Sequence, residues 1–172
     1  MSRRKTKNEI FKKIDGIAFG FVCIICVTAC AKDGDTGKKA EGFSVKYNDV
    51  ELVLGAEAAD VLEELGEANS SDELFDCGAG NSRMLYRYSS FDLYTMKSDG
   101  KEVIDQIELK DDVATTDLGI YIGSDEAKVR SEYGEPDREA KNGITYKDGE
   151  LEVTFDIKDG KVSGIGLLRV TQ

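Results

Sequence analysis

Cysteine is the residue type in this chain with the clearest capacity for covalent chemistry. The 172 residues include four cysteines and no histidine. Cys30 directly follows a short apolar segment that ends in small residues, whereas Cys23 and Cys26 lie within that segment. A cysteine thiolate is a soft nucleophile, and it forms a stable thioether when it is alkylated. We therefore expect covalent modification at Cys30 and only an apolar role for Cys23 and Cys26.

The chain before Cys30 has the form of a secretory signal. Six basic and two acidic residues come first, and an apolar run follows over residues 17–29. This run is shorter than the ~20 residues that a membrane-spanning helix needs. A basic start followed by a short apolar run is typical of a signal peptide. The sequence therefore predicts a signal peptide over residues 1–29.

The residues Val27-Thr28-Ala29-Cys30 resemble the lipobox of bacterial lipoproteins. The resemblance implies that the Cys30 thiol receives diacylglycerol and that signal peptidase II cleaves between Ala29 and Cys30. Two acyl chains anchor a protein durably in a membrane, whereas a single chain is marginal. The expected location is the extracytoplasmic face of the cell membrane. The alternative is an ordinary signal peptide or a signal anchor with an incidental cysteine.

The charge of the chain from Cys30 onward limits its partners. This part has 17 basic and 32 acidic side chains, which is a net charge of −15. Such a surface repels nucleic-acid phosphates and anionic lipid headgroups, so nucleic acid is not an expected partner and attachment must come from lipid. The absence of histidine removes the most common general base and the most common ligand of zinc and copper. We expect no cofactor and no metal site.

A polar, glycine-rich segment over residues 30–42 separates Cys30 from the rest of the chain. We expect it to be a flexible tether. Its Asp33 and Asp35 resemble the start of a calcium loop, but the later ligand positions are missing. Cys77 is the one thiol that remains unmodified after processing, so an internal disulfide is impossible. We expect Cys77 to be a buried structural residue, because a reactive thiol would lack a histidine to activate it.

An internal repeat organises the chain after the tether. Residues 54–68 align without gaps on residues 122–136, with matching glycines and Gly-Glu pairs. Farther along, Tyr86, Phe91, Leu93 and Asp99–Lys101 match Tyr146, Leu151, Val153 and Asp159–Lys161, with eight extra residues in the first copy. Self-similarity of this kind indicates that one supersecondary unit occurs twice. We predict a first α+β repeat over residues 43–112 and a second over residues 113–172.

Each repeat is predicted to open with a short helix. The first helix has an apolar stripe of Ala58, Val61, Leu62 and Leu65 and ends at Gly66. The second is predicted to have Ser124 as its N-cap, Val129 and Tyr133 on one face, and Gly134 with Pro136 at its end. Because isolated helices of this length are unstable in water, both need a sheet beneath them.

Antiparallel strands are predicted around the helices. Apolar and polar residues alternate over residues 151–158, which indicates a half-buried strand. The hairpin-turn pairs are Asp99-Gly100, Asn142-Gly143, Asp148-Gly149 and Asp159-Gly160. Another hairpin is expected from residues 43–47 and 50–54 across Asn48-Asp49, and Asp111–Asp117 is expected to be a polar connector. The predicted fold class is α+β, with two tandem repeats, each a short helix packed on an antiparallel β-meander.

A helix that ends in Leu-Gly-Glu or Tyr-Gly-Glu-Pro, followed by strands with Asp-Gly turns, resembles the tandem repeat of beta-lactamase inhibitory protein. It is also similar to the single unit of the BamE (SmpA/OmlA) lipoproteins. The segments around Cys77, Asp111-Asp112 and residues 119–123 resemble uncharacterised lipoproteins of Gram-positive anaerobes. The resemblance implies a curved sheet with helices on one face and an open face for protein contact. The chain lacks the paired cysteines and the tryptophan of the inhibitor, so inhibition of a beta-lactamase is not expected.

The leading functional hypothesis is a non-enzymatic binding or scaffold module that engages an unknown envelope protein. Four strand aromatics, Tyr86, Tyr88, Phe91 and Tyr94, either supply contact area for that partner or pack in the core. One alternative is a lipoprotein that binds a small ligand or cation. Another is an envelope hydrolase that uses Asp72 with Glu73 or Asp111 with Asp112, although no catalytic motif flanks either pair.

Lipidation at Cys30 can be tested by substitution. We expect the Cys30→Ser protein to take up no fatty-acid analogue during metabolic labelling, because a hydroxyl is a much weaker nucleophile than a thiolate. The wild-type protein should be labelled and should sediment with membranes. A Cys23→Ser protein is the matched control and should be labelled like the wild type. Label on the Cys30→Ser protein would refute the assignment.

Overall fold

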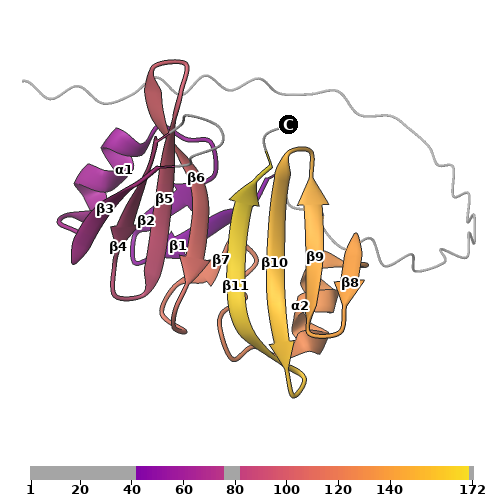
Figure 1. The fold of residues 1–172 in the computed structure, drawn as a ribbon. Coiled ribbons are helices and arrows are strands. Elements are labelled where there is room, and N and C mark those ends of the chain that lie inside the picture. Colours follow the sequence, from indigo (N-terminus) through magenta and orange to yellow (C-terminus); the bar gives the residue numbers. More distant parts are fainter. Residues whose placement is uncertain (1–41, 76–81, 171–172) are drawn as a thin grey trace, which may run out of the picture. The chain divides into compact units, whose positions relative to one another are not determined.

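The computed structural model describes residues 42–75 and 82–170, which form a mixed α+β structure of antiparallel strands and helices (Figure 1). The α+β class with antiparallel strands is thereby confirmed. The predicted signal peptide, the cleavage site at Ala29 and Cys30, nearly all of the tether, and Cys77 lie outside the described residues.

The larger of two sheets has eight strands in the order β3-β4-β5-β6-β11-β10-β9-β8. Their bounds are β3 Ser70–Phe75, β4 Ser82–Arg87, β5 Phe91–Ser98, β6 Lys101–Leu109, β8 Arg138–Ala140, β9 Gly143–Asp148, β10 Leu151–Lys158 and β11 Lys161–Arg169. Every pair of neighbours is antiparallel. Strands β3 to β6 and strands β8 to β11 each run as a meander, as predicted, and the two meanders meet where β6 pairs with β11.

The hairpin turns of the large sheet follow the sequence prediction closely. Asp99-Gly100 joins β5 to β6, and Asp159-Gly160 joins β10 to β11, with positive φ at all four residues. This is the backbone conformation that a two-residue type I′ turn requires. The hairpins at Asn142-Gly143 and Asp148-Gly149 also form, but β9 already includes Gly143 and Asp148, so each turn lies one residue away from the predicted pair.

A smaller, three-stranded sheet has the order β2-β1-β7, with β1 Ser44–Tyr47, β2 Val50–Val53 and β7 Thr115–Thr116. Strands β1 and β2 form the predicted hairpin, and Asn48 has the positive φ of its turn. Strand β7 lies inside the segment that was predicted to be only a polar connector. That prediction was wrong for Thr116, which is buried and whose Oγ1 accepts a hydrogen bond from the Ile120 N–H at 3.2 Å.

Two helices occur in the described part of the chain, α1 (Ala58–Leu65) and α2 (Glu126–Tyr133). Both predicted apolar stripes pack against the core, and Gly66 and Gly134 end the helices with positive φ. The predicted N-cap was wrong, because α2 begins after Asp125, and the buried Ser124 side chain instead accepts a hydrogen bond from the Tyr121 N–H at 3.1 Å. Neither helix is long and apolar enough to cross a membrane.

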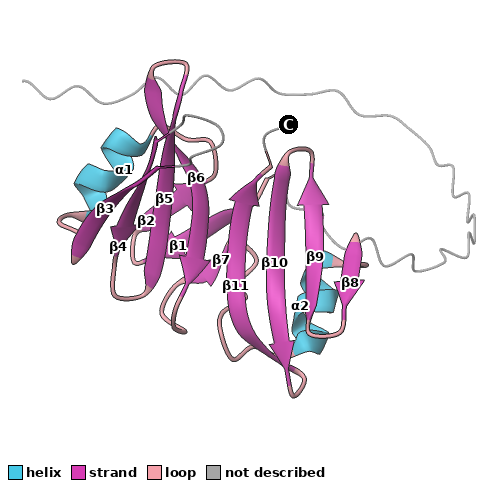
Figure 2. Cartoon of the chain, in the orientation of Figure 1, coloured by secondary structure: helices cyan, strands magenta, loops and turns pink. Residues whose placement is uncertain are grey.

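One hydrophobic core lies between the large sheet, the two helices and the small sheet (Figure 2). The predicted alternation in β10 is confirmed, since Val153 and Phe155 are fully buried. The ring of Phe155 lies 5.1 Å from that of Tyr133, in an edge-on arrangement. Aromatic pairs with this geometry stabilise a core beyond the area that they bury.

The contribution of this core can be measured with a matched pair of phenylalanine variants. We expect Phe155→Ala to lower the free energy of unfolding by about 3–5 kcal/mol, because it removes a large, fully buried side chain. Phe75→Ala should change it by no more than about 0.5 kcal/mol, because Phe75 is 73% exposed. Urea denaturation measures both values, and equal effects would contradict the placement of β10.

Candidate protein-binding face

The large sheet has a second face, which points away from the helices. Directly paired residues on neighbouring antiparallel strands share a face, so the register assigns side chains to it. One row across the sheet is Ser70, Arg87, Asp92, Glu108, Gly166, Thr154, Thr145 and Arg138. The next row is Asp72, Leu85, Tyr94, Gln106, Leu168, Glu152 and Lys147. We call the surface formed by these two rows and their neighbour Arg83 the open face.

Arg83 organises the β4–β6 part of the open face. Its guanidinium lies 2.7 Å from a carboxylate oxygen of Asp105 and donates a hydrogen bond of 2.9 Å to Gln106. It also lies 5.1 Å from the centre of the Tyr94 ring, which is a cation–π distance. Asp105 is only 5% exposed, so this ion pair is largely withdrawn from solvent. One arginine therefore holds three neighbouring side chains in place.

A β-bulge explains how Asp105 comes to face Arg83. Gln106 pairs with Tyr94 and Ile104 pairs with Thr95, so Asp105 is an extra residue in β6. A bulge bends its strand and redirects a side chain locally. Here it adds a carboxylate beside Gln106 without displacing Ile104, which stays fully buried in the core.

Tyr94 continues the polar network toward the centre of the sheet. Its hydroxyl donates a hydrogen bond of 3.4 Å to Glu108, and Gln106 donates one of 2.6 Å to the other carboxylate oxygen of Glu108. Partial burial raises the pKa of the Tyr94 phenol, the nearby Glu108 charge raises it further, and Arg83 opposes both effects. The phenol thus remains a neutral hydrogen-bond donor at physiological pH.

The centre of the open face is a glycine with no local structural requirement. Gly166 lies between Glu108 and Thr154, and a Cβ atom there would meet no other atom within 4 Å. Its neighbour Gly164 is different, because a Cβ there would lie 2.7 Å from Asp156. A strand glycine without packing or backbone constraint often marks a place where another chain approaches closely. Beside it, Leu168 is 38% exposed.

Ion pairs and hydroxyls occupy the far end of the open face. Glu152 pairs with Lys147 and, at 3.7 Å, with Arg138. The hydroxyl oxygens of Thr145 and Thr154 are 3.1 Å apart. The open face therefore has charge-paired ends and a central region formed by Gly166, Leu168 and Glu108.

The structure decides between the two roles left open for the four aromatic residues. Phe91 is fully buried and Tyr88 nearly so, and their rings stack at 4.9 Å. Tyr86 pairs with Leu93 and therefore lies on the helix-covered side. Tyr94 alone of the four belongs to the open face. Of the four, only Tyr94 is therefore placed to supply contact area on the open face.

Of the two carboxylate pairs proposed for a hydrolase, Asp72 and Glu73 do not converge. Asp72 and Glu73 are neighbours in β3, so their side chains point to opposite faces, and Asp72 forms an ion pair with Arg87. Asp111 accepts a hydrogen bond of 3.0 Å from the Val113 N–H, which is a local turn contact. Among residues 42–75 and 82–170, no group of three metal-ligating side chains is positioned to hold a metal ion.

Comparisons of the chain with protein-family models, curated proteins and solved structures found no significant match. Sequence reasoning did not single out Arg83, Asp105 or Gly166. A partial signal for Arg83 was available, since Arg83, Leu85 and Arg87 have the two-residue spacing of one strand face. The Asp105 bulge left no such signal, because bulges depend on pairing with a partner strand.

The importance of the Arg83–Asp105 pair can be tested by removing the arginine. We expect Arg83→Ala to lower the free energy of unfolding by about 1–3 kcal/mol, because the nearly buried Asp105 carboxylate loses its cation. Lys101→Ala is the control and should have a much smaller effect, since both groups of the Lys101–Glu57 pair are exposed. In a double-mutant cycle with Asp105→Ala, the two losses should not add. Additive losses would show that the pair is not coupled.

Proposed function

We propose that this protein is a lipid-anchored module on the extracytoplasmic face of the membrane and that it binds another envelope protein through the open face. The proposed role is non-enzymatic. The observation that carries it is the open face itself, an eight-stranded surface whose polar side chains are ordered by one another around an exposed centre. The lipobox sequence ending at Cys30 supports the location.

The dimensions of the open face suit a protein partner. Neighbouring strands lie about 4.8 Å apart, so eight strands span roughly 34 Å. Specific protein interfaces bury about 800 Å² on each partner. A surface of this width, two or three side-chain rows deep, approaches that area. Small ligands use concave pockets and would contact only a fraction of such a surface.

The chemistry of the open face also favours a protein. Tyrosine and arginine are enriched among the residues that dominate binding energy, and Tyr94 stacks with Arg83. Because both side chains are already held by hydrogen bonds, little conformational entropy remains to be lost on binding. Leu168 offers exposed apolar area next to Gly166, where a partner side chain could reach the backbone.

We further propose that residues 43–112 and 113–172 are two copies of one unit. The same contacts recur in both parts. Gly55 N–H donates to the Ile104 carbonyl at 2.7 Å, and Gly123 N–H donates to the Val162 carbonyl at 2.8 Å. The hydroxyls of Tyr88 and Tyr146 each donate, at 3.2 Å, to the carbonyl of the glycine that ends the preceding helix.

These recurrent contacts refine the sequence alignment of the copies. They favour Tyr88, rather than Tyr86, as the equivalent of Tyr146. The bulge in β6 lies opposite Tyr94 and Thr95 of β5, and the bulge in β11 lies opposite Asp156 and Ile157 of β10. Matching these two bulges aligns Thr95 with Ile157, which also differs by two residues from the alignment based on sequence alone. On this alignment, Ile107 corresponds to Ile165 and Leu109 corresponds to Leu167. The two strands pair crosswise, because Leu109 lies opposite Ile165 and Ile107 lies opposite Leu167. Duplication would thus account for one continuous open face.

The binding proposal can be tested by cross-linking the lipidated protein in its own membranes and quantifying the proteins that co-purify. We expect one near-equimolar envelope protein. Gly166→Arg should abolish its recovery, because the new side chain stands on the open face, while the unfolding temperature should change little, since a Cβ at this site meets no atom.

The matched control is Asp60→Arg, which places the same side chain on the exposed surface of α1. This variant should recover the partner at the wild-type level. Equal recovery by both variants would exclude the open face as the binding surface. Failure of the wild-type protein to recover any partner would refute protein binding.

A further inference from the structure

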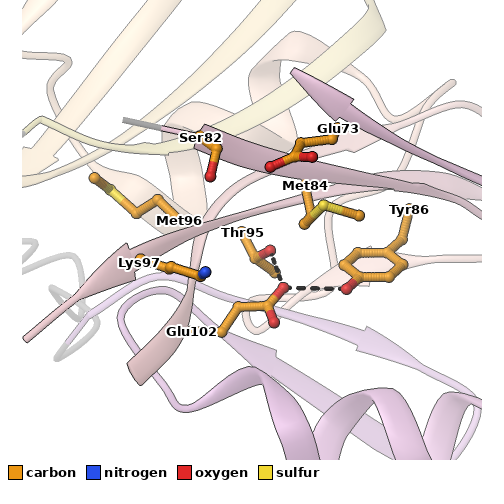
Figure 3. Close-up of a pocket in the computed structure, with 8 residues that line it drawn as sticks. All are labelled: Glu73, Ser82, Met84, Tyr86, Thr95, Met96, Lys97 and Glu102. Atoms are coloured by element: carbon orange, nitrogen blue, oxygen red, sulfur yellow. Dashed lines mark hydrogen bonds between the residues drawn. The ribbon is translucent and has the colours of Figure 1, made fainter. Parts of the chain in front are cut away.

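A pocket of about 320 Å³ lies on the helix-covered side of the large sheet, near its β3 edge (Figure 3). Its lining includes Glu73 from β3, Met84 and Tyr86 from β4, Thr95 and Lys97 from β5, and Glu102 from β6. Thr95 and Lys97 alternate with the core residue Leu93 along β5, so they point to the same face of the sheet as Leu93. The other four side chains share this face, because strand pairing connects them to these β5 residues. All six therefore lie on the opposite side of the sheet from the open face, which is the proposed protein-binding surface, whereas Met96, which also lines the pocket, is paired with Arg83 of the open face.

Glu102 is held in position by two hydroxyl groups. Tyr86 donates a hydrogen bond of 3.1 Å to Oε1 of Glu102, and the fully buried Thr95 donates to the same oxygen (Figure 3). Burial, together with the Glu102 charge, raises the pKa of Tyr86 to about 12. Both hydroxyls are therefore neutral donors at physiological pH. They orient the carboxylate without neutralising it.

No ion pair involves Glu102 in the part of the chain that the structure describes. Lys101, its neighbour, pairs with Glu57 at 2.9 Å. Lys97 is its cross-strand partner, but no ion pair joins the two among the described residues. With Glu73, the pocket has two carboxylates and one ammonium group, so its net charge is negative.

The corresponding positions in the second part of the chain are apolar. On the alignment given by the recurrent contacts, Tyr86 corresponds to Ile144 and Thr95 corresponds to Ile157. Ile144 is buried, and Ile157 packs against the core. Two polar residues thus replace two aliphatic ones beside the pocket, and the strand pair β3–β4 is longer than β8–β9. This comparison relies on the proposed duplication, whereas the pocket and its hydrogen bonds do not.

We propose that this pocket binds a small organic ammonium ion with a short apolar body. The oriented carboxylate of Glu102, with Glu73 beside it, supplies the negative charge that an ammonium group needs. The Tyr86 ring and the Met84 thioether supply surfaces that favour a cation and its alkyl chain. The net charge of −15 from Cys30 onward attracts cations to the whole molecule.

The two methionines of the processed protein provide a direct probe. Met84 and Met96 both line the pocket, and Met1 is lost with the predicted signal peptide. We would label the methionine methyl groups with carbon-13 in the lipidated protein, in neutral detergent micelles, and titrate with n-pentylammonium chloride. We expect a saturable shift of the Met84 resonance. The neutral analogue n-pentanol should bind at least about tenfold more weakly, since it lacks the charge.

Substitutions separate specific binding from general attraction to an acidic protein. Glu102→Gln should weaken n-pentylammonium binding by at least about tenfold. Glu73→Gln should also weaken it, and this variant leaves the Tyr86–Thr95–Glu102 network intact. Glu132→Gln on α2 removes the same charge away from the pocket and should bind like the wild type.

Two results would overturn the proposal. One is the absence of a saturable shift with n-pentylammonium, and the other is equal affinity in the wild-type, Glu73→Gln and Glu132→Gln proteins. Neither depends on the open face. The Glu102→Gln protein should still recover the envelope partner in the cross-linking experiment, whereas Gly166→Arg should still bind n-pentylammonium.

Discussion

The antiparallel pairing of β6 with β11 is the interaction on which the rest of this structure depends. It joins two four-stranded meanders into one sheet through pairs such as Leu109 with Ile165 and Ile107 with Leu167. All four of these side chains are buried in the same core. A meander of four short strands with one short helix would bury little apolar surface alone, and small domains gain stability as the buried fraction increases. The central pairing therefore creates both the continuous core and the continuous open face.

The two faces of the sheet then have different physical roles. The helix-covered face is apolar where α1, α2 and the small sheet pack against it, and it is polar at the pocket near the β3 edge. On the open face, charged and polar side chains contact one another in ion pairs and hydrogen bonds, although the buried Nε of Arg83 has no hydrogen-bond partner among the described residues. Arg83 shows this best, since one guanidinium contacts Asp105, Gln106 and the Tyr94 ring. This division gives the sheet one largely apolar face and one polar face, and the polar face is the surface that we propose for the partner.

The proposed function combines an anchor with this surface. A lipid on Cys30 would confine the domain to the membrane, and the predicted tether over residues 30–42 would span roughly 20 Å as a flexible coil. A partner in the same membrane would then meet the open face at a high effective concentration, so that moderate intrinsic affinity suffices. The proposed ammonium-binding carboxylates, Glu73 and Glu102, lie on the other side of the sheet from the open face, so the two proposed binding events use different side chains.

Local features of the fold could be predicted from the sequence because they depend on neighbouring residues. The helix stripe of α1, its end at Gly66, the turn at Asp159-Gly160 and the alternation in β10 are all confirmed. Each follows from helical or strand periodicity, or from a backbone conformation that glycine accepts readily. The lipobox is likewise a local pattern. It remains a prediction, since Cys30 lies outside the described residues.

Only the tertiary structure decided which side chains share a face. Alternation separates Tyr86 from Leu85, but it does not reveal which of them faces the core. A bulge at Asp105 shifts the register by one residue, and such a shift moves every later side chain to the other face. The buried strand β7 and the crosswise pairing of β6 with β11 join residues far apart in the chain. The sequence alone determined the pieces and their order, whereas the open face and the pocket exist only because non-local backbone pairing brings those pieces into one register.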